Sequence, residues 1–157
     1  MNEKELLEEI SKLEAKVDAD KLLCRALEEN DWETLVSWWE AWPDWSTPLR
    51  NFLPDNGKGG IMIEKNKQSI VAGFLYQTNS KCVLLEWIVS NPDYKEKDRG
   101  DAVEMLIIEA EKLAKKTGYI YMFTIGRQKN LIAKHKKLGW FVDDKPSHEI
   151  AKVITSK

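Results

Sequence analysis

The 157-residue sequence is poor in cysteine and histidine and has no long apolar run. Its two cysteines, Cys24 and Cys82, are too few for a disulfide framework or a metal cage of their own, which favours a reducing cytoplasm and predicts no metal site. No apolar stretch approaches the ~20 residues of a membrane helix, and the charged start is not typical of a signal peptide. The net charge of −2 gives no general attraction for nucleic acid. We therefore expect neither a membrane nor a nucleic acid as a partner.

The chain does have the length and the apolar content of one globular domain. Domains usually contain roughly 100–200 residues, and the hydrophobic content of 43% argues against disorder. Tryptophan is concentrated in one stretch, because five of the seven lie at positions 32, 38, 39, 42 and 45. Composition does not explain this cluster, so its role depends on the elements around it.

The first 20 residues form a segment of their own. Leu6, Ile10, Leu13 and Val17 are spaced by four, three and four residues, which predicts an amphipathic helix. About two heptads are too short to define a coiled coil, so we favour a helix packed on the domain's own surface over a dimerisation helix. A homodimer is the alternative that this pattern leaves open. We expect residues 21–157 to form a single domain.

Periodicity and turn residues divide the remaining chain into strands and helices. Asn30 or Asp31 is expected to cap a helix that runs to about Trp42, because such side chains accept hydrogen bonds from the first turn. The mostly apolar strand Cys82–Ser90 suits a central position in a sheet. The other expected elements are strands at 21–26, 61–64, 69–77, 119–125, 140–142 and 149–154 and helices at 100–117 and 128–138. This order predicts an α/β (α+β) domain with one mixed sheet.

Two junctions between strands and helices carry the motifs. The strand that ends at Ser90 leads through a charged loop into a helix, and the free amides of a helix start favour an anion, although a merely capped helix start is the alternative. This junction reads Lys97-Asp98-Arg99-Gly100-Asp101-Ala102, and the second has Asn130 followed by Leu138-Gly139-Trp140. Together they resemble the phosphate loop (Gln/Arg-x-x-Gly-x-Gly/Ala) and the later Asn and Leu-Gly-Phe motif of the GNAT N-acetyltransferase superfamily, over residues 21–154.

The resemblance implies a GNAT-like fold and a site for acetyl-coenzyme A. The fold has a mostly antiparallel central sheet with flanking helices, and its fourth and fifth strands splay apart around the pantetheine arm. The residues implied in coenzyme binding are Ile88, Val89, Ser90, Lys97, Asp98, Arg99, Gly100, Asp101, Ala102 and Asn130. The backbone amide of Val89 would face the thioester carbonyl. The carboxylates of Asp98 and Asp101 disfavour a pyrophosphate unless they point away from it.

Acetyl transfer to an amine needs a base and an acid. Glu86 is the one ionisable side chain in the strand 82–90, and burial would raise its pKa towards neutral pH, which suits a base. The alternatives are a structural carboxylate in an ion pair and a solvent-facing one. The family often has a tyrosine acid four residues before the glycine of Leu-Gly-Phe. This chain has His135 there, and an ordinary surface histidine is the alternative. Tyr94 and Tyr121 are further candidate donors.

The acceptor is expected to meet an acidic segment rich in tryptophan. Residues 28–55 contain seven acidic side chains and one arginine, a net charge of −6. In the superfamily this region forms a wall of the acceptor site, and its composition suits a small cationic amine or a peptide amine. The residues at helical spacing that we expect to face the sheet are Trp32, Leu35, Val36 and Trp39. The candidates for acceptor binding are Trp38, Trp42, Trp45 and Glu86.

Two hypotheses for function follow from the resemblance. The first is a cytoplasmic enzyme that transfers an acetyl group directly from acetyl-CoA to a primary amine. The second is a catalytically degenerate GNAT-fold binding module, which would use the tryptophan-rich wall to hold a protein or a small ligand. The acidic residues around Gly100 and the histidine at position 135 favour the second hypothesis, and the two motifs in the family's order favour the first.

Overall fold

The computed structural model describes residues 2–19 and 21–155, and for residues 13–19 it describes the backbone alone. The chain divides into two compact units, residues 1–125 and 126–157. The expected boundary between residues 20 and 21 touches a residue outside the described ranges and stays a prediction. In the described part of the chain, no helix is both long and apolar enough to cross a bilayer.

Helix α1 (Glu3–Ala19) forms where the amphipathic pattern predicts it. Its described side chains are all exposed, including Leu6 at 50%, Leu7 at 59% and Ile10 at 41%. For these side chains, the expectation that the helix packs on the domain's own surface is wrong. An apolar helix stripe is buried only where a complementary apolar surface meets it, and no such surface covers these three residues.

One sheet contains all five strands, in the order β1-β2-β3-β4-β5. Their bounds are β1 Leu22–Ala26, β2 Gly60–Lys65, β3 Gln68–Gln77, β4 Cys82–Ser90 and β5 Tyr121–Phe123. The first four strands pair antiparallel, whereas β4 and β5 pair parallel. The tight turn at Asn66-Lys67, where both residues have positive φ, suits the antiparallel β2–β3 hairpin. The predicted mixed and mostly antiparallel sheet is confirmed.

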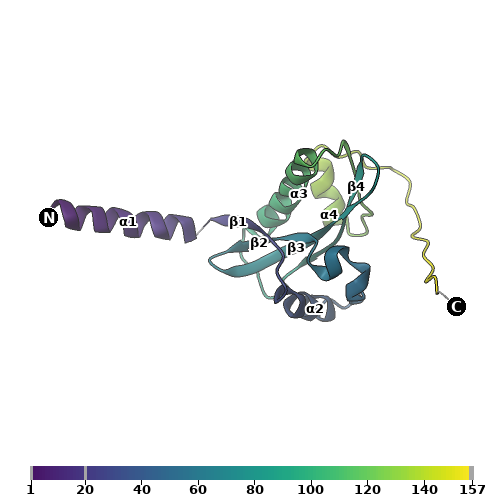
Figure 1. The fold of residues 1–157 in the computed structure, drawn as a ribbon, viewed down its shortest axis with the longest axis horizontal. Helices are drawn as coiled ribbons and strands as arrows, with labels where there is room; N and C mark the ends of the chain where they lie inside the picture. Colours follow the sequence, from purple (N-terminus) through teal and green to yellow (C-terminus); the bar gives the residue numbers. More distant parts are fainter. Residues whose placement is uncertain (1, 20, 156–157) are drawn as a thin grey trace. The chain divides into compact units, whose positions relative to one another are not determined.

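Two helices cover opposite faces of this sheet (Figure 1). Helix α2 (Asp31–Ala41) packs on the face that carries Phe74. Helix α3 (Arg99–Lys116) packs on the face of the next residue, Gly73, where an added methyl group would lie 3.1 Å from the Leu106 side chain. As predicted, Gly118 ends α3, and its φ of +94° belongs to a Schellman motif. Two short 3-10 helices, η1 (Arg50–Phe52) and η2 (Pro54–Gly57), precede β2.

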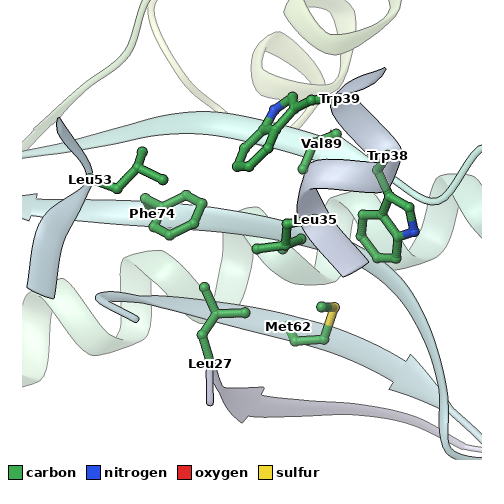
Figure 2. Close-up of a cluster of buried hydrophobic side chains, with 9 residues drawn as sticks. Leu27, Leu35, Trp38, Trp39, Leu53, Met62, Phe74 and Val89 are labelled. Carbon is green, nitrogen blue, oxygen red and sulfur yellow. The ribbon is translucent and has the colours of Figure 1, made fainter. Parts of the chain in front are cut away.

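The core between α2 and the sheet takes in much of the tryptophan cluster (Figure 2). Trp39 is fully buried, with its ring stacked on Phe74 at a centroid distance of 6.3 Å. Trp38 is 4% exposed and belongs to the same core. The expectation that Trp38 lies outside the core, unlike Trp39, is therefore wrong. The physical reason is the helix face, because the buried positions of α2 are 31, 35, 38 and 39, an i, i+4, i+7, i+8 stripe. The indoles of Trp32, Trp42 and Trp45 lie half-buried at the border of this core.

An ion pair, rather than the predicted side-chain cap, holds the start of α2. The N-cap residue Asn30 makes no capping hydrogen bond among the contacts described for this helix. The Asp31 carboxylate instead accepts two hydrogen bonds from the Arg25 guanidinium, at 2.7 and 2.9 Å, and one from the Glu28 amide at 2.8 Å. Arg25 Nε also donates to Glu64 at 2.9 Å. Burial opposes the charge of Asp31, but the hydrogen bonds from Arg25 and from the Glu28 amide, together with the Arg25 charge, outweigh it and hold the pKa of the Asp31 carboxyl below its usual value.

The second unit contains helix α4 (Lys129–Lys137). Gly139, with φ +92°, ends this helix in another Schellman motif, in which the amides of Gly139 and Trp140 donate to the carbonyls of Lys136 and His135. The Leu-Gly-Trp motif is therefore a helix stop.

The end of the chain differs from the sequence prediction. The strands expected at 140–142 and 149–154 are wrong, because the described residues up to 155 contain no strand after β5. β5 itself is also shorter than the predicted 119–125. Apolar residues form a strand only beside a hydrogen-bonded neighbour, and these side chains stay in solvent, with Phe141 91% and Ile150 93% exposed.

Candidate functional site

Strands β4 and β5 separate after a short parallel pairing. The three residues of β5 pair with Cys82, Val83 and Leu84, so the edge of β4 leaves the ladder from Leu85 onwards. The Glu86 carboxylate lies at this opening and accepts a hydrogen bond of 2.7 Å from the Ile125 amide. The splayed fourth and fifth strands of the predicted fold are confirmed.

A bulge interrupts the pairing of β4 with β3 at the same level. Ala72 pairs with Val89 and Phe74 with Glu86, so two residues of β4 oppose Gly73 alone. Trp87, inside the bulge, has a left-handed φ of +57°. A bulge bends a strand and re-aims the groups beyond it. The end of β4 therefore points differently from the segment that pairs with β5.

At the end of β4, the backbone N–H and C=O groups of successive residues face β3 and the open edge in turn. The Asn91 amide donates to the Ile70 carbonyl of β3 at 2.7 Å. Because this direction alternates along a strand, the N–H and C=O of Ser90 face the open edge, and those of Val89 face β3. The Ser90 carbonyl accepts a hydrogen bond of 2.9 Å from the Trp42 indole, which agrees with this direction. The register therefore favours Ser90 over Val89 as the backbone group at the opening.

The first turn of α3 leaves two amides without a described backbone acceptor. The Arg99 amide donates to the Glu96 carbonyl at 3.2 Å, and the Ala102 amide donates to the Asp98 carbonyl at 2.9 Å. Among the described backbone contacts, the amides of Gly100 and Asp101 have no acceptor. They lie at the positive end of a helix of 18 residues. This arrangement suits an anion.

Asp98 precedes these amides but directs its carboxylate elsewhere. Its Oδ2 lies 2.8 Å from Lys65 Nζ, and its Oδ1 accepts a hydrogen bond of 2.6 Å from the Tyr94 hydroxyl. These two contacts hold the pKa of the Asp98 carboxyl below its usual value. Burial, and then the bond to Asp98, raise the pKa of Tyr94 to about 12. The buried Tyr94 hydroxyl is thus engaged with Asp98, which argues against its role as the proton donor.

Trp42 joins the acceptor segment to both β4 and α3. Besides its bond to Ser90, its ring lies 5.3 Å from the Arg99 guanidinium carbon, a cation–π contact. One indole therefore contacts two residues that the sequence assigns to coenzyme binding. The half-buried Trp45 amide donates to the Trp42 carbonyl at 3.2 Å. The acceptor roles of Trp42 and Trp45 stay predictions.

Tyr76, which the sequence did not single out, lies beside the candidate base. Its hydroxyl donates to the Phe52 carbonyl at 3.1 Å. Burial raises the pKa of Tyr76, a hydrogen bond with Trp87 lowers it, and the charge of Glu86 raises it further. No sequence signal marks this residue, because its neighbours come from β4 and from η1.

Part of the negative charge of the acceptor segment is already paired. Glu29 contacts Arg50 at 2.6 Å and Lys58 at 3.8 Å, and Asp31 is bound by Arg25. The Arg50 guanidinium also lies 5.2 Å from the Trp32 ring centroid. The acidic residues of the segment with exposed side chains are Glu28, Glu29, Glu33, Glu40, Asp44 and Asp55. The segment therefore keeps exposed negative charge for a cationic acceptor.

The second unit contains the two remaining candidates. Asn130 is exposed in the first turn of α4. His135 is 4% exposed, so the alternative of an ordinary surface histidine is wrong. Its Nδ1 lies 2.8 Å from the Leu131 carbonyl, and its ring packs edge-on against Trp140 at 4.8 Å. Its Nε2 is buried without a partner among the described residues. The catalytic role of His135 stays a prediction.

No protein-family model matches the sequence, and no curated protein sequence is significantly similar to it. Solved structures do resemble the chain. The ribosomal-protein-S18-alanine N-acetyltransferase of Escherichia coli aligns with 19% identity and a TM-score of 0.60, over 76% of this chain and 77% of that one. An aminoglycoside acetyltransferase from an uncultured soil metagenomic sample, in complex with sisomicin, aligns with 14% identity and a TM-score of 0.59, over 85% and 97%.

The N-acetylglutamate synthase of Neisseria gonorrhoeae, complexed with coenzyme A and N-acetyl-glutamate, aligns with 12% identity and a TM-score of 0.55 over 66% of this chain. The chain spans only 25% of the length of that synthase. At these identities the likeness shows the fold. The fold is that of the GNAT acetyltransferases, as the two sequence motifs predicted.

Proposed function

We propose that this chain is an acetyl-CoA-dependent N-acetyltransferase that transfers the acetyl group directly to a primary amine. The observation that carries the proposal is a combination within one GNAT fold: β4 and β5 separate at Glu86, and the start of α3 presents the unpaired amides of Gly100 and Asp101. Two of the similar structures are acetyltransferases, and a third is a synthase with coenzyme A bound.

The start of α3 is proposed to hold the pyrophosphate of acetyl-CoA. The amides of Gly100 and Asp101 donate to its oxygens, and the side chains of Lys97 and Arg99 supply positive charge. Ala102, fully buried below this turn, leaves the surface free for the ligand. The backbone of Ile88 and Ser90 is proposed to pair with the pantetheine arm at the open edge. Val89 is proposed to hold the end of β4 against β3, and Asp98 to precede the amides that bind the pyrophosphate. Asn130 is proposed to contact the coenzyme.

Glu86 is proposed to act as the base. The ammonium group first loses one proton to water, and the Glu86 carboxylate takes a second proton from the nitrogen as that nitrogen bonds to the acetyl carbonyl carbon. The carbon–sulfur bond then breaks, and the sulfur receives one proton from an acid. His135 is the proposed acid: with Nδ1 bound to the Leu131 carbonyl, Nε2 is the nitrogen that carries the transferred proton. Tyr76 is the second candidate, because its phenol lies in the field of Glu86.

The acceptor is proposed to be a cationic small molecule or a peptide amine. Its ammonium group would meet the exposed carboxylates of residues 28–55 and the faces of Trp42 and Trp45. The buried Trp38 is proposed to support this wall from within the core. The similar structures act on or bind acceptors of several kinds, including a ribosomal protein alanine and an aminoglycoside.

A direct test is to incubate the full chain with acetyl-CoA and a panel of amines and to measure free thiol release and acetylated product. We expect turnover with a cationic amine, and a fall of roughly 10²-fold in kcat for Glu86→Gln with its acidic pH limb lost. Glu9→Gln, an exposed change on α1, serves as the control. Full activity of Glu86→Gln would contradict the role of this residue.

The rival function is a GNAT-fold binding module without catalysis. The observation that favours it is His135 in the place of the family's tyrosine, held by the Leu131 carbonyl. This rival predicts that the chain binds coenzyme A, or a ligand of the acidic segment 28–55, but releases no thiol with any amine. A homodimer stays a proposal that light scattering on the full chain decides.

A further inference from the structure

Asp98 occupies a position from which this chain can block its own anion site. It is the N-cap residue of α3, and Arg99, Gly100 and Asp101 follow as the first three helical residues. An N-cap carboxylate normally accepts a hydrogen bond from the second or third of these amides. For Asp98 those are the amides of Gly100 and Asp101, the same two groups that the proposed function assigns to the pyrophosphate.

The expected capping bond is not made. The structure describes no side-chain capping contact for Asp98, and its φ and ψ of −86° and 7° differ from the extended backbone that a capping residue usually adopts. Both carboxylate oxygens have other partners: Oδ2 is bound by Lys65 Nζ at 2.8 Å, and Oδ1 by the Tyr94 hydroxyl at 2.6 Å.

These two partners are built into the fold rather than contributed by flexible surface groups. Lys65 is the last residue of β2, and its side chain is 31% exposed. Tyr94 is only 4% exposed and lies in the loop that leads to α3. The Asp98 side chain itself is 23% exposed. A charged pair that is partly withdrawn from water and reinforced by a buried hydroxyl holds its geometry better than an exposed pair.

We infer that Lys65 and Tyr94 are positioning residues that hold the Asp98 carboxylate away from α3 and so keep the Gly100 and Asp101 amides free for an anion. The inference rests on the proposed function and adds to it. Lys65 also pairs with the negative charge of Asp98, so that this carboxylate repels a pyrophosphate less. Without Lys65, the freed carboxylate turns to the helix start, caps it and competes with the ligand.

Binding of coenzyme A to the full chain, measured by calorimetry, tests this inference. Lys65→Met is expected to weaken binding by roughly tenfold, and Tyr94→Phe, which removes one of the two contacts, by a smaller factor. Lys67→Met removes an exposed lysine two residues away and is expected to leave binding unchanged. Circular dichroism and thermal unfolding establish that each variant is folded.

The decisive variant is the double change Lys65→Met/Asp98→Ala. If Asp98 competes for the amides, removing its carboxylate restores binding to within about threefold of the wild type. If Lys65 instead contributes its own charge to the ligand, the double variant stays as weak as Lys65→Met, and the inference is overturned. Unchanged binding in Lys65→Met overturns it as well.

A measurement without coenzyme separates this inference from the proposed function. In ligand-free Lys65→Met, the Gly100 and Asp101 amides are expected to exchange with solvent more slowly than in the wild type, because the carboxylate then accepts from them. Absence of coenzyme binding by the wild type would contradict the proposed function alone. Equal amide exchange in both proteins would contradict the positioning role alone.

Discussion

At the scale of single residues, carboxylates held by cations organise the first unit. Arg25 binds Asp31 and Glu64 and so ties β1 to β2 and to the start of α2. Lys65 binds Asp98 and ties the end of β2 to the start of α3. Composition and local spacing did not reveal the long-range pairs, because Lys65 and Asp98 are 33 residues apart and Arg25 and Glu64 are 39 apart. The sequence did single out Glu86, since its charge stands alone in an apolar strand.

Replacing Asp31 with alanine tests the first of these pairs. The carboxylate is 8% exposed, and Asp31→Ala leaves the Arg25 guanidinium without its main partner, so we expect the free energy of unfolding to fall by about 3 kcal/mol. Glu33→Ala, an exposed change in the same turn of α2, is expected to cost under about 0.5 kcal/mol. Urea unfolding measures both. Equal losses would show that the ion pair does not stabilise the start of α2.

The lowered pKa of Asp31 and of Asp98 gives stability a pH dependence of known sign. A carboxyl group whose pKa is depressed by folding stabilises the protein above its unfolded pKa of about 3.9, and the stabilisation is lost as the pH falls through the folded pKa. The free energy of unfolding should therefore fall as the pH is lowered from about 5 to 2. The free energy of unfolding of Asp98→Asn should fall less than that of the wild type over this interval. Two parallel curves of this free energy against pH would contradict the contribution of Asp98.

At the scale of elements, apolar periodicity was sufficient for most strands and helices. The strand Cys82–Ser90 and the helix after Gly100 were predicted almost to the residue. Periodicity failed where an element depends on a partner, as in the expected strands at 140–142 and 149–154. On α2 the prediction was half right: Leu35 and Trp39 are buried as expected, but Asp31 and Trp38 complete the buried stripe in place of Trp32 and Val36.

Two glycines test the packing and the termination of these elements. A methyl group at Gly60 would lie 2.1 Å from the Gly73 carbonyl oxygen, so Gly60→Ala forces β2 and β3 apart and should cost about 3 kcal/mol or more. A methyl group at Gly118 meets no atom within 4 Å, and its cost of about 1 kcal/mol comes from φ alone. Thermal unfolding ranks the two variants. A larger loss for Gly118→Ala would contradict both reasons.

At the scale of the whole molecule, the motifs predicted the GNAT fold, and the structure confirmed it. The sequence could not predict the β4 bulge or the Lys65–Asp98 contact at the proposed site, because both arise from pairing between distant segments. Helix α1 also departs from expectation, since its apolar residues are exposed.

The exposure of α1 predicts a small effect on stability. Leu6 and Ile10 are 50% and 41% exposed, so the double change Leu6→Ser/Ile10→Ser should alter the free energy of unfolding by under about 0.5 kcal/mol. A loss above ~1 kcal/mol, with unchanged molecular mass by light scattering, would show that the helix packs on its own domain. A fall in mass at equal concentration would instead indicate a homodimer.

The most direct measurement is a nuclear magnetic resonance titration of the full ¹⁵N-labelled chain with coenzyme A. A coenzyme bound at the start of α3 should shift the amide signals of Gly100 and Asp101 the most, together with those of Ile88 and Ser90 on the open edge of β4. Shifts that saturate at these four residues are the predicted result. Unchanged signals for Gly100 and Asp101 at millimolar coenzyme A would contradict the proposed acetyl-CoA site.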